Sequence, residues 1–228
     1  MSGIFITGTD TEVGKTVITA GLLITARRCA KTAIGMKPVA SGAVHTKAGL
    51  RNDDATTLLD QSRPQLDYAT HNPFAFELPA SPNIAALKAD ATVSLDILNA
   101  AFTRCSAVAD IVLVEGVGGW RVPLSNTLQT VDLVRNLNLP VILVVGMRLG
   151  CINHALLSIE AIKFDGIELL GWIANSIDRR YEYHRETMET LLERIDAPLL
   201  GCVEWHDKAV DLERVADAVG QGTSRFWT

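Results

Sequence analysis

The chain alternates short apolar runs with longer segments that carry apolar residues at helical spacing. Six runs rich in valine and isoleucine predict strands at residues 4–7, 32–36, 111–114, 141–145, 169–174 and 199–203. Helices are predicted at residues 16–30, 95–108, 152–164, 182–195 and 209–219. Four of the runs lack period-two alternation, which is typical of strands buried on both faces. The pattern therefore predicts an α/β fold, a mostly parallel sheet flanked by helices, in a single domain spanning residues 1–228.

Residues 42–82 depart from this pattern. Glycine and several prolines interrupt them and leave room for at most a short helix at residues 54–61. In a compact domain, so long a stretch of weak structure is more often functional than idle. We therefore expect residues 42–82 to lie over a binding site.

The composition is that of a folded globular protein, and it narrows the classes of partner. Hydrophobic residues make up 48% of the 228 residues, and the formal net charge is −5 with no run of lysine or arginine. Binding to nucleic acid or to an anionic membrane normally needs a basic face, so neither is expected. Four cysteines without a CxxC pair predict reduced thiols. The first residues enter a strand directly and no apolar stretch approaches ~18 residues, so we expect a cytoplasmic protein.

The strongest motif lies between the first predicted strand and the first predicted helix. Residues 8–16 read GTDTEVGKT, a Walker A phosphate loop with five residues, instead of the usual four, between the glycine and GKT. Gly14 would let backbone N–H groups approach an anion, and Lys15 would add a full positive charge. Thr16 could place its hydroxyl on Mg²⁺. An ordinary glycine turn with an exposed lysine would require strand, glycine, GKT and helix to coincide by chance.

Acidic residues at two further positions could complete a magnesium site. Glu115 ends the apolar run at residues 111–114, at the carboxyl edge where α/β sheets place ligands. Gly116 and Gly118 follow and would bring backbone close to a ligand. Asp53 and Asp54 are candidates from the insert, although an aspartate there could equally cap a helix, and the residues alone do not choose between the two.

A second lysine follows the second predicted strand. Pro38 biases Lys37 towards an extended conformation, from which its side chain could point towards the phosphate loop. From this residue alone, an ordinary exposed lysine is the favoured interpretation, and Ser41 is likewise a common turn residue.

Taken together, these motifs resemble a known family. Residues 8–16 (GTDTEVGKT), 37–42 (KPVASG), 50–55 (LRNDDA), 114–120 (VEGVGGW) and 150–154 (GCINH) are similar in order and spacing to the dethiobiotin synthetases, across essentially the whole chain. The longer phosphate loop is that family's own version. The resemblance implies a P-loop NTPase-type domain and a homodimer. It also implies a reaction of diaminopelargonate, CO₂, ATP and Mg²⁺ that yields dethiobiotin, ADP and phosphate.

The resemblance also implies roles for individual residues. Lys15 and Lys37 would stabilise a carbamate and the transferring phosphoryl group, and Thr11 would help to hold the carbamate. The implied magnesium ligands are Thr16, Asp54 and Glu115, which selects Asp54 over Asp53. The implied substrate-binding residues are Thr11, Ser41, Gly150, Cys151, Ile152 and Asn153, the last four at a helix start and across the dimer interface. The implied nucleotide-binding residues are Glu12, Val13, Gly14, Lys15, Thr16, Val17, Asp54, Glu115, Gly116, Val117, Gly118, Asn175, Ser176, Glu204, Trp205 and His206.

Within the nucleotide set, the resemblance places Asn175 at the position of the family's adenine-reading asparagine. An amide can both donate to and accept from an adenine edge. Cys151 needs no role for its sulfur and is expected to be a small buried thiol. The sequence departs from the family at Glu204, where proline is usual, and at Thr187, where an aromatic residue is expected near the substrate chain.

Other functions remain alternatives at this point. A P-loop amide ligase would activate a carboxyl-like oxygen in the same way, but it usually needs an ammonia-producing glutaminase, for which the chain has no length to spare. A nucleotide-switched partitioning ATPase usually has an extra lysine early in the phosphate loop, whereas positions 9–13 read TDTEV. A homologue with the same fold and a shifted substrate is the third alternative.

Overall fold

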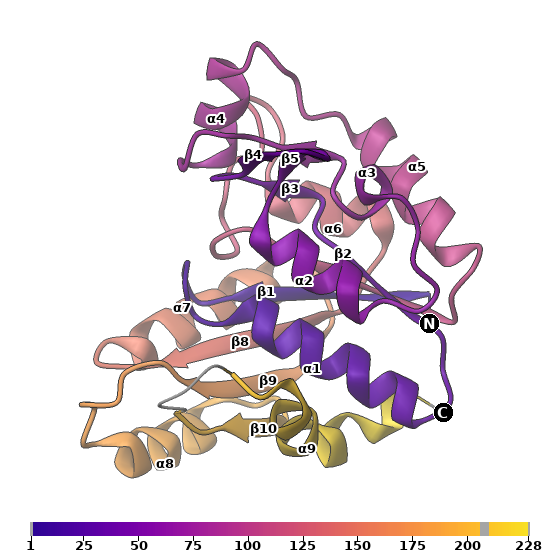
Figure 1. The fold of residues 1–228 in the computed structure, drawn as a ribbon. Coiled ribbons are helices and arrows are strands. Elements are labelled where there is room, and N and C mark those ends of the chain that lie inside the picture. Colours follow the sequence, from indigo (N-terminus) through magenta and orange to yellow (C-terminus); the bar gives the residue numbers. More distant parts are fainter. Residues whose placement is uncertain (1, 206–209, 228) are drawn as a thin grey trace.

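The computed structural model describes residues 2–205 and 210–227, and its centre is a six-stranded parallel sheet (Figure 1). The strands lie in the order β10-β9-β8-β1-β7-β2, and each neighbouring pair is parallel. All six predicted strands are confirmed. They are β1 (Gly3–Gly8), β2 (Ala33–Met36), β7 (Ile111–Glu115), β8 (Val141–Met147), β9 (Leu169–Ser176) and β10 (Leu199–Val203).

Helices cover both faces of this sheet, which explains the continuous apolar runs. The five predicted helices are present as α1 (Lys15–Arg28), α5 (Leu95–Ser106), α7 (Cys151–Phe164), α8 (His184–Arg194) and α9 (Leu212–Thr223). Along β1, Ile4 and Ile6 enter a core with α1 and α9, whereas Phe5 enters the opposite core with α5. Figure 1 shows α1 and α9 packed side by side on one face. The expected α/β architecture is therefore confirmed.

One helix beside the sheet was not predicted. α6 (Thr130–Leu137) buries Val131, Leu133 and Val134, and it begins where the Asp132 carboxylate accepts a hydrogen bond from the backbone N–H of Gln129. Glutamine is not one of the usual residues at a helix start, and the apolar segment is short. Neither signal was strong enough for the sequence to reveal this helix.

The insert is more ordered than predicted. The expected short helix is present as α2 (Asp53–Gln61). The insert also forms short elements that the sequence did not predict: β4 (Val44–Thr46), β5 (Gly49–Arg51), α3 (Tyr68–His71) and β6 (Phe74–Ala75), followed by α4 (Pro82–Lys88). β6 pairs with β3 (Val39–Ala40), directly after Lys37. Strands of two or three residues are too short to show a periodicity, which is why the prediction of at most a short helix in this insert was wrong.

Within residues 2–205 and 210–227, none of the helices combines the length and the apolar character that crossing a bilayer would require. The four cysteines, Cys29, Cys105, Cys151 and Cys202, are free thiols, as expected.

Candidate active site

The phosphate loop joins β1 to α1 and is held in a strained conformation that glycine tolerates. Gly14 has a φ of 87° and stands at the start of α1. A Cβ atom added there would lie 2.1 Å from Asn175 Nδ2, so a side chain at this position would collide with the asparagine. Lys15 follows at once and bends back, so that its Nζ donates to the backbone oxygen of Asp10 at 2.8 Å. The loop therefore curls around the position of its own lysine.

A cleft of about 430 Å³ opens beside this loop. Its lining comes from the phosphate loop, from the segments that follow β2 and β7, and from the start of α2, so it lies at the carboxyl ends of neighbouring parallel strands. The lining residues are Thr11, Glu12, Gly14, Lys15, Thr16, Val17, Lys37, Ala40, Ser41, Asn52, Asp54, Glu115, Val117 and Gly118. Twelve of these were candidate site residues in the sequence, and Gly116 and Val13 lie next to lining residues.

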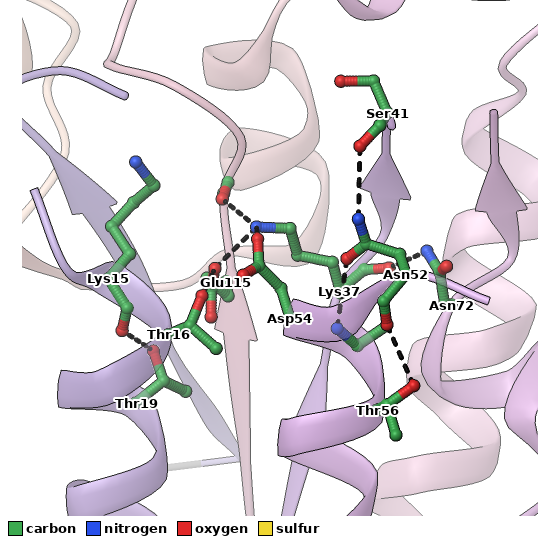
Figure 2. Close-up of polar contacts among 12 residues, drawn as sticks. Lys15, Thr16, Thr19, Lys37, Ser41, Asn52, Asp54, Thr56, Asn72 and Glu115 are labelled. Atoms are coloured by element: carbon green, nitrogen blue, oxygen red, sulfur yellow. Dashed lines mark hydrogen bonds and ion pairs between the residues drawn. The ribbon is translucent and has the colours of Figure 1, made fainter. Parts of the chain in front are cut away.

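Lys37 lines the cleft, and Figure 2 shows its ammonium group beside the carboxylates of Asp54 and Glu115. Its Nζ lies 2.5 Å from Glu115 Oε1 and 3.0 Å from Asp54 Oδ2, and it also donates to the backbone oxygen of Gly116 at 3.2 Å. The hydroxyl of Thr16 donates to the same Glu115 oxygen at 2.8 Å. The side chain of Lys37 is only 4% exposed, so the interpretation of this residue as an ordinary surface lysine is wrong.

Burial and neighbouring charges act differently on the two lysines. Burial, reinforced by the nearby Lys37, lowers the pKa of Lys15 to about 8. Burial would also lower the pKa of Lys37, but the carboxylates of Glu115 and Asp54 outweigh it and the pKa is raised. For Asp54, burial would raise the pKa, and the Lys37 ammonium outweighs it so that the pKa is lowered. Lys37 and Asp54 are therefore charged at neutral pH, whereas Lys15 is poised to lose its proton under mildly alkaline conditions.

The oxygen atoms around Lys37 fit the ligand chemistry of Mg²⁺. A hydroxyl from Thr16 and carboxylates from Asp54 and Glu115 are hard oxygen ligands, and the buried Oε2 of Glu115 has no hydrogen-bond partner among the described residues. In the part of the chain that the structure describes, no group of three or more His, Cys, Asp or Glu side chains could hold a metal ion. Two carboxylates and a hydroxyl suit an ion that keeps water and takes phosphate oxygens as further ligands, as Mg²⁺ does.

The structure also separates the roles of the two insert aspartates. Asn52 caps α2, with its side-chain oxygen accepting from the N–H of Ala55 at 3.3 Å, so neither aspartate is the cap. Asp54 faces the cleft and contacts Lys37, whereas Asp53 is exposed. Position thus favours Asp54, as the family resemblance implied.

Several candidate residues lie away from the cleft. Asn175 is buried beneath the phosphate loop, where its amide donates to the backbone oxygen of Val13 at 2.9 Å. The hydroxyl of Ser176 lies 2.8 Å from His184 Nε2. Glu204 and Trp205 are exposed beyond β10, and His206 lies outside the described residues. The predicted base-binding roles of these residues stay predictions.

The loop before α7 is connected to the phosphate loop by an ion pair. Gly150, with a φ of 93°, begins α7; Ile152 is half-buried and Asn153 is exposed. Cys151 is buried, which raises the pKa of its thiol and agrees with its expected passive role. Arg148, just before these residues, donates to the Asp10 carboxylate at 2.5 Å.

Four polar residues of the site were not recognised in the sequence. Asp10 and Arg148 form the ion pair just described, and Asn52 and Asn72 donate side-chain hydrogen bonds to the backbone oxygens of Ser41 and Lys37. A departure noted above has a structural counterpart: the hydroxyl of Thr187 lies 2.6 Å from that of Tyr181. Asp10 and Asn52 lie within the motifs described above, but these contacts form only in the folded chain, so a local pattern carried no signal for them.

The sequence of the chain is similar to known dethiobiotin synthetases. The ATP-dependent dethiobiotin synthetase BioD of Xanthomonas oryzae pv. oryzae (strain PXO99A) is 48% identical over 216 residues, which cover 95% of each chain. The protein of the same name from Xylella fastidiosa (strain 9a5c) is 47% identical and covers 88% of this chain and 89% of its own. The chain belongs to the dethiobiotin synthetase family. The resemblance seen in the motifs is thereby confirmed, and with it the expectation of an ATP-dependent enzyme.

Other comparisons agree on a P-loop fold. A family model described as an AAA domain matches residues 2–212 of this chain. The MinC:MinD cell division protein complex of Aquifex aeolicus superposes with a TM-score of 0.61 at 18% identity, over 99% of this chain and 96% of that chain. A ParA family ATPase from Chlorobium tepidum TLS has a TM-score of 0.53 at 11% identity, over 97% and 92%. At such identities the likeness shows the fold alone. The cell division protein and the ParA family ATPase therefore share the architecture, and the sequence relatives decide the family.

Proposed function

We propose that the chain carboxylates 7,8-diaminopelargonate with CO₂ and closes the ureido ring of dethiobiotin, a step of biotin biosynthesis, at the expense of ATP and with Mg²⁺. One amine of the substrate takes up CO₂ and loses a proton to give a carbamate. A carbamate oxygen attacks the γ-phosphorus and ADP leaves. The second amine then attacks the carbonyl carbon of the mixed anhydride, phosphate leaves, and the ring closes.

One observation carries the proposal: Lys15, Lys37, Thr16, Asp54 and Glu115 converge on a single cleft although they come from four separate segments of the chain. Two ammonium groups and a phosphate loop suit an anionic nucleophile and a triphosphate that must approach each other. Both reactants are negatively charged, so their mutual repulsion is a large part of the barrier that the site must reduce.

The lysines would divide this work. Lys15 starts at the first residue of α1, so straightening its side chain away from the Asp10 carbonyl brings the ammonium to phosphates held at the helix terminus. Lys37 enters the same cleft from the end of β2, where its ammonium can meet the carbamate and the transferring phosphoryl group. Thr11, on the exposed rim of the cleft, and Ser41 are placed to hold the diamine and its carbamate.

Thr16, Asp54 and Glu115 would hold Mg²⁺ in this scheme. The ion would neutralise charge on the ATP phosphates. The residues of the chain supply its ligands and keep them in place: Thr16 and Glu115 are already in contact through a 2.8 Å hydrogen bond.

A homodimer and a distant carboxylate site complete the proposal. Gly150, Cys151, Ile152 and Asn153 at the start of α7 present backbone N–H groups that suit a carboxylate, and in the family these bind across a dimer interface. Support comes from the exposed apolar residues around α7: Leu149 is 85% exposed, and Leu157 and Phe164, seven residues apart on one side of the helix, are also exposed. Large exposed apolar groups in one region are typical of association surfaces. A cytoplasmic location, small-molecule substrates only, and no nucleic-acid or membrane partner remain predictions.

The test is an assay that detects dethiobiotin by mass and phosphate in parallel, with diaminopelargonate, bicarbonate, ATP and Mg²⁺ omitted one at a time. The proposal requires equal amounts of dethiobiotin and phosphate, and only when all four components are present. ATP hydrolysis without ring closure would contradict the proposed substrate, and a dependence on glutamine would indicate the amide-ligase alternative.

A further inference from the structure

The backbone of Lys37 is held on both sides by a segment of the insert. The N–H of Lys37 donates to the backbone oxygen of His71 at 2.7 Å, and the side-chain amide of Asn72 donates to the backbone oxygen of Lys37 at 2.7 Å. Asn72 is buried, and its amide also donates to the backbone oxygen of Phe74 at 3.2 Å. Figure 2 shows Asn72 beside the backbone end of Lys37. Residues 71 and 72 therefore fix the point from which the catalytic lysine projects.

The same segment is anchored to β2, the strand that Lys37 follows. His71 is fully buried, and its Nε2 accepts from the N–H of Leu66 at 3.2 Å. That bond leaves the proton on Nδ1, which donates to the backbone oxygen of Gly35 in β2 at 2.7 Å. Burial lowers the pKa of His71, which favours this neutral form. The histidine thus attaches the segment firmly to β2, two residues before the lysine.

A tyrosine hydroxyl continues the connection to the start of α2. The hydroxyl of Tyr68 donates to Asn72 Oδ1 at 3.0 Å and accepts from the backbone N–H of Asn52 at 2.8 Å. Asn52 is the residue that caps α2, and Asp54 stands two residues further on. The side chain of Asn52 also donates to the backbone oxygen of Ser41 at 3.2 Å, as Figure 2 shows. One chain of hydrogen bonds therefore links Lys37, the helix start that carries Asp54, and Ser41.

From this network we infer that Tyr68 and Asn72 are positioning residues, which set the Lys37 ammonium and the Asp54 carboxylate relative to each other through the hydroxyl of Tyr68. Neither side chain lines the cleft, so both act through other residues. Lys37 follows the end of β2 and Asp54 lies in α2, and the segment between them contains β3, β4 and β5. A fixed link between them preorganises the site, whereas a small displacement of a reacting group can be costly for the rate.

Tyr68→Phe is the sharpest test because it removes only one oxygen atom. The aromatic ring, which lies under the Arg51 guanidinium at 4.0 Å, is retained. We expect kcat to fall about tenfold and the KM for ATP to change by less than about twofold, since the contacts to the nucleotide are kept while the reacting groups are displaced. Tm should fall by about 2–4 °C for the loss of one hydrogen bond in a chain of this size. Tyr183→Phe, at an exposed tyrosine, is the matched control and should alter neither value.

A double-mutant cycle tests whether the residues act as one network. If Tyr68 acts through Asn72, the Tyr68→Phe/Asn72→Ala variant should have a kcat within about twofold of that of Asn72→Ala alone, because coupled residues are not additive. A kcat for Tyr68→Phe equal to that of wild type, with the same small drop in Tm, would overturn the inference and leave the hydroxyl a purely structural role. Effects that multiply in the double variant would overturn the single network.

This inference rests on the proposed function for its kinetic readout, and a structural readout separates the two. If the wild-type chain made no dethiobiotin, the proposed reaction would fail, and the inference would be judged on the crystal structure of Tyr68→Phe. The separation between Lys37 Nζ and Asp54 Oδ2, 3.0 Å in the wild-type chain, should lengthen in the variant. An unchanged separation would overturn the inference whatever the reaction is.

Discussion

Replacing Lys37 with methionine separates its chemical role from its structural one. The side chain keeps a similar length and apolar stem but loses the charge. In the wild-type chain the ammonium contacts Glu115 at 2.5 Å and Asp54 at 3.0 Å. The two carboxylates are not equivalent, because the Glu115 side chain is 0% exposed whereas that of Asp54 is 44% exposed. The substitution therefore leaves one carboxylate buried without its counter-charge and the other able to find water.

From this geometry we expect Lys37→Met to lose both folding stability and turnover. Leaving one partner of a buried ion pair uncompensated costs about 3–5 kcal/mol, and we expect the lower end because Thr16 still donates to Glu115. Removing a preorganised positive group from the developing phosphoryl charge should lower kcat on the order of 10²–10³-fold. The first loss is read from the free energy of unfolding in urea, and the second from dethiobiotin formation at saturating substrates.

A second substitution distinguishes the two effects. In Lys37→Met/Glu115→Gln the buried charge is removed with its partner, so the free energy of unfolding should return towards that of wild type while turnover stays lost. Lys88→Met, at an exposed lysine, is the control and should affect neither measurement. The reasoning is refuted if Lys37→Met keeps kcat within about threefold of wild type, because so small a change is incompatible with a group that meets the transition state.

Three further predictions concern Lys15, Gly14 and Asn175, which lie in or directly against the phosphate loop. Because the pKa of Lys15 is lowered to about 8 and only the charged form attracts phosphate, kcat/KM for ATP should fall as pH rises through about 8, and Lys15→Arg should remove this fall. A value that stays level up to about pH 10, where an ordinary lysine titrates, would contradict this. Gly14→Ala should weaken ATP binding in calorimetry, because its Cβ would lie 2.1 Å from Asn175 Nδ2 at a φ of 87°; wild-type affinity would show that the loop relaxes freely. Asn175→Ala should weaken selection of adenine over other bases, and an unchanged nucleotide profile would exclude Asn175 from base recognition.

The sheet could be predicted from the sequence because a strand that is buried on two faces consists of consecutive apolar residues. β8 is buried along its whole length, and its residues form an uninterrupted apolar run. The small elements of the insert show no such apolar run. β3 and β6 contain two residues each and exist because they pair with each other, so their stability comes from tertiary contacts that a local pattern does not record.

The residues of the candidate site likewise differ in how far the local sequence revealed them. Lys15 and Glu115 were found from local context, since each stands at a strand or helix boundary where a ligand is expected. Lys37 looked like an ordinary lysine until the family resemblance gave it a role, because its burial depends on Asp54 and Glu115, which are distant in the sequence.

The charge state of Lys37 explains why this lysine needs the hydrogen bonds of Tyr68 and Asn72. An ammonium that must meet an anionic reactant gains from a desolvated position, but desolvation favours the neutral form and would remove the charge. Glu115 and Asp54 reverse this effect and raise the pKa of Lys37. The same two carboxylates also bind the ammonium group by hydrogen bonds, which draws it away from a reactant. The lysine is useful only if the carboxylates stay close enough to keep it charged and are placed so that it can still reach the cleft. That balance depends on how the end of β2 and the start of α2 are placed relative to each other, and Tyr68 and Asn72 link these two points by hydrogen bonds.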